Sequence, residues 1–213
     1  MWIAVRFVRS VWKFVVLTVF RCLLRLGNWL LKIKRRLRYF TEMRLTLTKS
    51  WEKSLHDLWS RLQKQNSGGV KTAVIGVGHE LQRDDAVGVW VARWLRPFAS
   101  ETLCVIEGAH APENTTGRIR KFAPDLVLFV DAAVLDEPPG TIRWIDWQQA
   151  GGMSATTHTL PLDMISRYLI AETGCEVGMI GIQPADMTYG ESMSEAVAAA
   201  GQVVVDKLVQ LIS

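Results

Sequence analysis

Apolar positions follow two different spacings from Val70 to the C-terminus. Short, continuous apolar runs alternate with longer segments in which apolar residues recur every three or four positions. The first spacing predicts buried strands and the second predicts amphipathic helices. The predicted strands are Thr72–Val77, Leu103–Glu107, Leu126–Asp131, Ile142–Ile145 and Val177–Ile182. The predicted helices are Asp85–Leu95, Thr115–Phe122, Leu162–Glu172 and Met193–Leu211.

The order of these elements indicates the fold class. Continuous apolar strands that alternate with helices are typical of a mostly parallel sheet covered on both faces. We therefore predict an α/β fold, a three-layer sandwich with a twisted, mostly parallel sheet of about five strands and helices on both faces, preceded by a basic helical N-terminal extension.

One further helix is predicted before the first strand. The segment KSWEKSLHDLWSRLQKQ (49–65) has apolar residues at three- and four-residue spacing, which indicates an amphipathic helix packed on the domain that follows. They are Trp51, Leu55, Leu58 or Trp59, and Leu62. Gln65–Gly69 has the composition of a hinge. The predicted organisation is a basic extension over 1–48, a helix with a Gly-rich hinge over 49–69, and an α/β domain over 70–213.

Charge divides the chain at about the same place. Residues 1–66 contain fifteen Lys or Arg and three Asp or Glu, a net charge of +12, whereas the remaining residues have a net charge of −8. The formal net charge of +4 is therefore an average of two unlike parts. Cys22, Cys104 and Cys175 form no CxxC or paired spacing, which fits a reducing compartment, and we expect a cytoplasmic protein.

The basic extension predicts an interfacial helix rather than a membrane span. Its longest uncharged stretch, Phe14–Phe20, has seven residues, whereas a spanning helix needs roughly 20. Each central Arg or Lys would cost about 2.5–3.5 kcal/mol. A signal peptide is not favoured, because Arg21 follows the short apolar core and no small-residue cleavage site is present. Tryptophans and the KIKRRLR run (32–38) are typical of peripheral association with an anionic membrane surface.

Two other interpretations of residues 1–42 stay open. The basic helix would also dock on an acidic partner protein, or translation would start at Met43. Binding of nucleic acid is not predicted, because no recognised nucleic-acid fold accompanies the basic segment.

Three candidate metal ligands follow three separate apolar runs: Asp85, Asp131 and His158. In parallel sheets ligands bind outside the carboxyl ends of the strands, and all three residues are expected to reach that edge. Two carboxylates and one imidazole would bind a divalent metal and leave coordination positions open. Each residue also has a structural interpretation: Asp84 and Asp85 as helix caps, Asp131 as a turn residue, and His158 as a structural histidine.

Other catalytic patterns are weak. The Gly76-Val77-Gly78 start of a dinucleotide fingerprint is broken by Leu81 at the third glycine position. The HELQR segment (79–83) is one residue short of HExxH and falls in a predicted loop, and no GxSxG occurs.

Five motifs occur in order along the α/β domain: GVGHELQRDDAVG (76–88), GAHAPEN (108–114), VDAA (130–133), TTHTLPL (156–162) and GIQP (181–184). With these motifs, residues 70–211 resemble the hydrogenase maturation endopeptidase family, most closely its hydrogenase-3-type members. The chain departs from the family's first motif at His79, where Asn is usual, and at Ala86, where Gly is usual. Neither departure removes a candidate ligand.

The resemblance implies a hydrolase: an endopeptidase, aspartic-type or metal-dependent, which removes the C-terminal extension of a nickel–iron hydrogenase large-subunit precursor after nickel insertion. It implies that Asp85, Asp131 and His158 are both the catalytic and the metal-contacting residues. The expected ion is the nickel carried by the precursor, with Zn²⁺ or another divalent metal as an alternative. The expected substrate-binding residues are His79, Glu113, Asn114, Thr157 and Gln183. A non-catalytic nickel-sensing assembly factor and a dinucleotide-binding enzyme stay open as alternatives.

Overall fold

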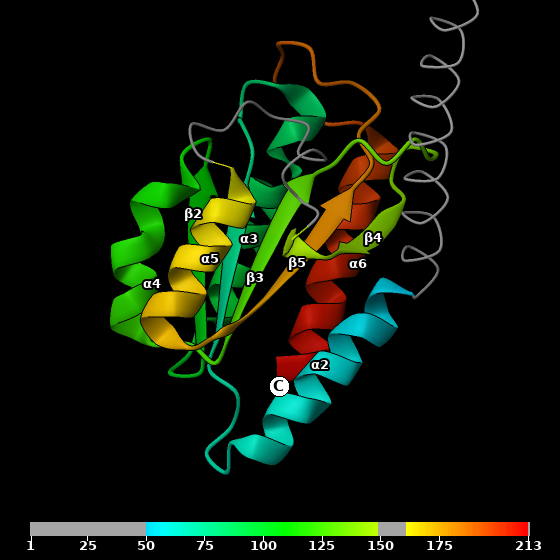
Figure 1. Ribbon diagram of the computed structural model, residues 1–213. Coiled ribbons are helices and arrows are strands. Elements are labelled where there is room, and N and C mark those ends of the chain that lie inside the picture. The colour runs from blue at the N-terminus through cyan, green and yellow to red at the C-terminus, as the bar shows by residue number, and fades with distance from the viewer. Residues whose placement is uncertain (1–49, 149–160, 213) are drawn as a thin grey trace, which may run out of the picture. The chain divides into compact units, whose positions relative to one another are not determined.

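Five strands form one sheet in the computed structural model, which describes residues 50–148 and 161–212. The strands are β1 (Thr72–Val77), β2 (Leu103–Ala109), β3 (Leu126–Ala132), β4 (Ile142–Ile145) and β5 (Glu176–Ile182). Their order across the sheet is β2-β1-β3-β5-β4, with β4 antiparallel to β5 and the other neighbours parallel (Figure 1). All five predicted strands are confirmed, with small differences at the ends of β2, β3 and β5.

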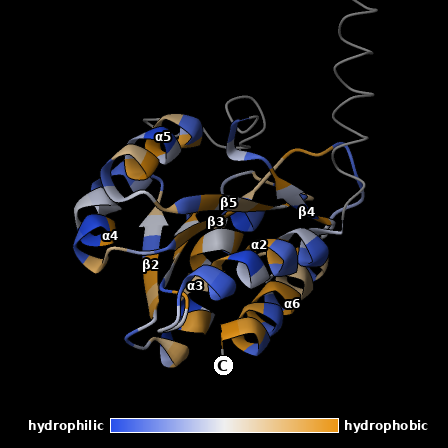
Figure 2. Ribbon diagram, turned by 60° about the horizontal axis from the view of Figure 1, so that its bottom comes forward, coloured by the Kyte–Doolittle hydropathy of each residue, from blue (hydrophilic) through white to orange (hydrophobic). Residues whose placement is uncertain are grey.

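Helices cover both faces of this sheet. They are α2 (Trp51–Gln65), α3 (Val87–Leu95), α4 (Thr116–Phe122), α5 (Leu162–Thr173) and α6 (Glu195–Ile212), with 3-10 helices η1 (Arg83–Ala86), η2 (Arg96–Phe98) and η3 (Pro112–Thr115). Figure 2 shows α4 and α5 on one side of the strands and α2, α3 and α6 on the other. The predicted α/β three-layer fold with a mostly parallel sheet is therefore confirmed.

Burial explains why the central strands are almost entirely apolar, with Thr72 and Asp131 as the polar exceptions in β1 and β3. Every residue of β1 and β3 is buried, because these strands lie inside the sheet and between two helical layers. The edge strand β4 is mostly half-buried. The central strands therefore have no polar face, which is the pattern expected of parallel sheets.

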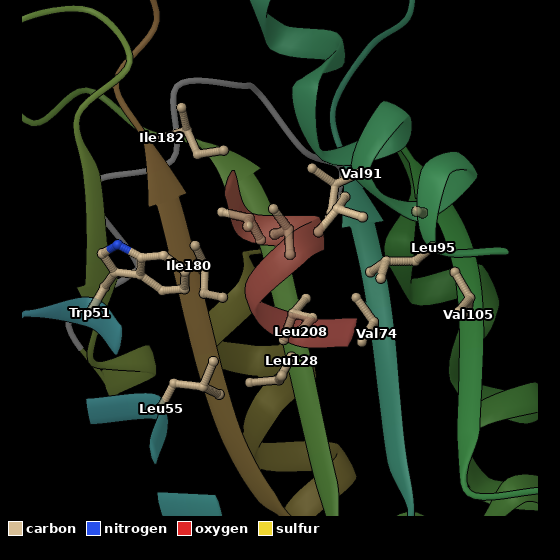
Figure 3. Close-up of a cluster of buried hydrophobic side chains, with 14 of the residues drawn as sticks. Trp51, Leu55, Val74, Val91, Leu95, Val105, Leu128, Ile180, Ile182 and Leu208 are labelled. Atoms are coloured by element: carbon tan, nitrogen blue, oxygen red, sulfur yellow. The ribbon is translucent and has the colours of Figure 1, made fainter. Parts of the chain in front are cut away.

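The α2 helix is part of the same core. Its five buried side chains belong to one apolar cluster with strand and helix residues of the following domain: Trp51, Leu55, Leu58, Trp59 and Leu62. Figure 3 shows Trp51 and Leu55 beside Ile180 of β5. The predicted packing of this amphipathic helix is thus confirmed, whereas the proposed division into segments 1–48, 49–69 and 70–213 stays a prediction.

Several predicted helix ends were wrong by one or two residues. The helix predicted from Asp85 begins at Val87, because the four preceding residues form the tighter η1 helix. The α5 helix ends at Thr173, where Gly174 adopts a left-handed conformation with φ 71°. No helix within 50–148 and 161–212 combines the length and apolar character needed to cross a membrane. Residues 1–42, and with them the predicted surface helix, lie outside the described residues.

Candidate active site

The carboxyl ends of β1 and β3 meet at one edge of the sheet. The two strands are parallel neighbours, and Gly76 of β1 pairs with Val130 of β3. Asp131 follows Val130 and is fully buried, with its backbone opposite Gly181 of β5. Asp131 is therefore not a turn residue, because β3 continues through it to Ala132. A carboxylate within a packed strand has a well-defined position.

Two glycines bring the start of α3 against this edge. Gly78 has φ 132°, and a Cβ there would lie 1.8 Å from the carbonyl oxygen of Asp85. A Cβ at Gly88 would lie 2.1 Å from the carbonyl oxygen of Val130 and 2.3 Å from that of Val77. Only glycine permits contacts this close, so the turn after β1 folds back tightly and sets η1 beside β3.

The carboxylate of Asp85 closes the turn after β1. It is fully buried, and its Oδ2 accepts a hydrogen bond of 2.6 Å from the backbone N–H of His79. Two backbone bonds complete the turn, from Gln82 N–H to the carbonyl oxygen of His79 and from Asp85 N–H to that of Gln82. The capping interpretation is wrong, since neither η1 nor α3 has a side-chain cap.

Asp84 points in a different direction from its neighbour and organises the loop between β5 and α6. Its carboxylate is fully buried and accepts four hydrogen bonds of 2.6–3.0 Å. The donors are the backbone N–H groups of Ala185, Asp186 and Ser194 and the hydroxyl of Ser194. Asp84 thus has a structural role that sequence reasoning missed, because the sequence shows two identical adjacent residues and no signal that separates them.

Arg83 provides the change of direction. Its φ of 44° is unusual for a residue other than glycine, and its backbone N–H donates to the carbonyl oxygen of Gly190. Its side chain also pairs with Asp186, at 3.4 Å. Asp186 accepts the backbone N–H of Thr188, and this bond is the main reason that its pKa is lowered. The loop between β5 and α6 is therefore fixed to the turn that carries Asp85.

Two histidines lie side by side next to this turn. The rings of His79 and His110 are 5.6 Å apart between centroids and tilted by 35°. His79 Nδ1 also accepts a hydrogen bond of 3.2 Å from the backbone N–H of Leu81. Sequence reasoning missed His110, which lies in the loop after β2; the signal was its place in the GAHAPEN motif.

Salt bridges hold the same turn from the outside. Arg93 of α3 donates to Glu80 and, at 3.0 Å, to Glu107 of β2. The hydrogen bond to Glu80 is the main reason that the pKa of Arg93 is raised. The turn is thus connected to both its neighbouring strand and the helix that follows it.

The remaining candidates have different surroundings. Glu113 lies in η3, and its Oε2 is buried without a hydrogen-bond partner among the described residues. Asn114 is exposed. Gln183 uses both ends of its side chain within the protein, since Oε1 accepts Leu135 N–H at 2.6 Å and Nε2 donates to the Pro184 carbonyl oxygen at 3.0 Å. These bonds connect the end of β5 to the loop after β3.

Thr157 and His158 lie outside the described residues, so the structure does not test whether His158 meets the two aspartates. Within the described ranges, no three His, Cys, Asp or Glu side chains are grouped closely enough to hold a metal ion. Asp85 and Asp131 nevertheless share one edge of the sheet, and carboxylates are suitable ligands for divalent metals.

Comparison with known proteins gives a consistent result. Residues 91–211 match the model of a family described as hydrogenase maturation protease. The hydrogenase 3 maturation protease of Escherichia coli K12 is 33% identical over 133 residues, which cover 62% of this chain and 85% of that protein. The crystal structure of a [NiFe] hydrogenase maturation protease HycI from Thermococcus kodakarensis has 29% identity and a TM-score of 0.63, covering 71% of this chain and 98% of that one.

Proposed function

The chain belongs to the hydrogenase maturation protease family, and on this premise we propose that it removes the C-terminal extension of a nickel–iron hydrogenase large-subunit precursor after nickel insertion. Members of this family are endopeptidases that act in hydrogenase maturation. The observation that carries the finer proposal is the pair of fully buried carboxylates, Asp85 and Asp131, at one edge of the sheet.

The chemistry of these ligands fits a divalent ion. Carboxylates accept Ni²⁺ or Zn²⁺, and an imidazole from His158 would complete a ligand set with open positions. In this proposal the nickel belongs to the precursor, so the site recognises only a metallated substrate. A divalent ion held there can polarise a scissile carbonyl and lower the pKa of bound water.

The surrounding residues support this role by fixing the carboxylates in place. Asp131 lies within a buried strand, and Asp85 is oriented by the backbone N–H of His79. Such preorganisation matters, because a displacement of about 1 Å at a reacting centre can lower the rate about 100-fold. The rigid edge of the sheet therefore suits a site that must distinguish metallated from unmetallated precursor.

The decisive experiment is cleavage of a co-expressed large-subunit precursor, with and without nickel, followed by mass spectrometry. We expect loss of the C-terminal extension only with nickel. Asp85→Asn, Asp131→Asn and His158→Ala should each abolish the mass shift while circular dichroism stays unchanged. Asp57→Asn is the matched control, because Asp57 is exposed on α2. Full cleavage by Asp131→Asn would refute the assignment.

The same experiment separates the alternatives. A nickel-sensing assembly factor without catalytic activity would bind nickel-loaded precursor and leave its mass unchanged. A dinucleotide-binding enzyme would bind a cofactor in titration, and the broken glycine pattern at Leu81 argues against it.

For residues 1–42 we propose peripheral association with an anionic membrane surface. The support is the sequence alone: clustered Arg and Lys with interspersed Trp, each basic residue near the surface contributing about 1 kcal/mol. The full chain should sediment with anionic vesicles at low salt, and a chain beginning at Met43 should stay in the supernatant and still cleave nickel-loaded precursor. Equal sedimentation of both chains would refute this proposal, and binding to an acidic protein instead would favour docking.

A further inference from the structure

His79 is held by one contact of its backbone and two contacts of its ring. Its backbone N–H donates to Oδ2 of Asp85 at 2.6 Å, and its ring Nδ1 accepts the backbone N–H of Leu81 at 3.2 Å. The ring also lies against that of His110, with 5.6 Å between centroids. His79 is half-buried.

The bond from Leu81 determines which nitrogen of His79 carries the proton. A neutral imidazole has one N–H group and one acceptor nitrogen. Since Nδ1 accepts the Leu81 N–H, the proton lies on Nε2. Nε2 is therefore a hydrogen-bond donor and a poor metal ligand, and it forms no hydrogen bond with another residue in the described part of the chain.

We propose that His79 Nε2–H donates to a backbone carbonyl oxygen of the precursor and thereby aligns the chain beside the cleavage site. This inference rests on the proposed function. An ionised carboxylate only accepts hydrogen bonds, so Asp85 and Asp131 offer no hydrogen to a peptide carbonyl oxygen. A peptide that enters this edge of the sheet needs a donor, and His79 provides a neutral one next to Asp85.

The proposal also explains which other side chains suit this position. His79 accepts a bond at Nδ1 from the backbone N–H two residues further on and keeps Nε2–H as a donor. Asn has the same two properties, since its side-chain oxygen accepts that N–H in an Asx-turn and its NH₂ group donates. Ser can accept the backbone N–H, although more weakly than Asn, but its short hydroxyl is not long enough to donate to a bound peptide as well.

The test compares His79→Asn with His79→Ser in the full-length protein, on nickel-loaded precursor. Loss of one hydrogen bond to a bound carbonyl group should raise KM about 10-fold in the Ser variant with little change in kcat, because the bond is present in both the ground state and the transition state. The Asn variant should recover KM to within about threefold. Equal KM values for Ser and wild type, or an Asn variant as weak as Ser, would overturn the inference.

Two further measurements separate this inference from the proposed function. The Kd for nickel-loaded precursor can be titrated whether or not cleavage occurs, and the Ser variant should bind about 10-fold more weakly. If the wild type binds without cleaving and this difference persists, the proposed function fails and the role of His79 holds. Nitrogen NMR of the free protein should also find His79 protonated on Nε2 and unprotonated on Nδ1. A proton on Nδ1 of the neutral ring would refute the proposed donor directly.

Discussion

Asp84→Asn is expected to destabilise the protein strongly, although the substitution changes only one atom of the side chain's shape. Asp84 is fully buried and accepts four hydrogen bonds from the loop between β5 and α6. Oδ2 accepts three of them, and Oδ1 accepts the fourth, from Ser194 N–H at 2.6 Å. An Asn side chain has one acceptor oxygen, so it cannot reproduce this arrangement in either orientation.

The loss in the free energy of unfolding is estimated for the more favourable of the two orientations of the Asn side-chain amide. If the Asn oxygen takes the place of Oδ2, three bonds persist but change from charge-assisted to neutral, at a cost of about 1 kcal/mol each. The Asn NH₂ group then faces Ser194 N–H, and the unsatisfied donor costs about 1–3 kcal/mol. The neutral amide is easier to bury than a carboxylate, which offsets part of the sum. We expect the free energy of unfolding to fall by about 3–5 kcal/mol.

Urea denaturation followed by tryptophan fluorescence measures this change, with Asp57→Asn as the exposed control that should stay within about 0.5 kcal/mol of wild type. Hydrogen exchange should locate the effect, with faster exchange at the amides of Ala185, Asp186 and Ser194. If Asp84→Asn cost less than about 1 kcal/mol and left these amides protected, the structural role assigned to Asp84 would be wrong.

Three other substitutions or reactions test the described structure. Leu55→Ala should lower the free energy of unfolding in urea denaturation by about 2–5 kcal/mol, because Leu55 is fully buried. Lys53→Ala, at an exposed residue of the same helix, should change it by less than about 0.5 kcal/mol. Equal effects of the two substitutions would contradict the packing of α2. Ala123→Gly should raise the free energy of unfolding by about 0.5–1 kcal/mol, because Ala123 caps the end of α4 with φ 50°, a conformation that glycine adopts more easily. A lower free energy of unfolding would contradict that conformation. Burial raises the pKa of the Cys175 thiol, so iodoacetamide should modify Cys175 more slowly than the half-buried Cys104 in the folded protein. In denaturant the two cysteines should react at similar rates. Peptide mass spectrometry measures both rates.

The elements of the α/β domain could be predicted from sequence because its strands are buried on both faces. Continuous apolar runs such as residues 126–130 are too short for a typical helix and are separated by helical patterns, which favours buried strands. The 3-10 helices were not predicted, since three or four residues contain too little periodicity. For this reason the start of α3 was placed two residues too early, within η1.

The separate tasks of Asp84 and Asp85 could not be predicted for a different reason. Both are acidic, adjacent and fully buried, yet Asp85 accepts the His79 N–H and Asp84 accepts donors of the loop between β5 and α6, which a backbone turn before them makes possible. That turn depends on Arg83 at positive φ, which no sequence rule favours for arginine. It is stabilised by the bond from Arg83 N–H to Gly190, more than a hundred residues away. A local pattern therefore indicates a helix cap, whereas a contact distant in sequence makes Asp84 an anchor for a loop.

The geometry of the proposed site is coupled to the packing of the core through Gly88. This residue begins the part of α3 that touches the ends of both β1 and β3, with the carbonyl oxygens of Val77 and Val130 where a side chain would otherwise lie. Asp85 lies three residues before Gly88 and Asp131 directly follows Val130, so one backbone contact helps to set the separation of the two carboxylates. Because protein interiors are close-packed, this contact cannot lengthen without moving α3 away from its buried neighbours. The apolar core therefore stabilises the domain and also holds the two carboxylates in fixed relative positions, as the proposed recognition of a metal ion would require.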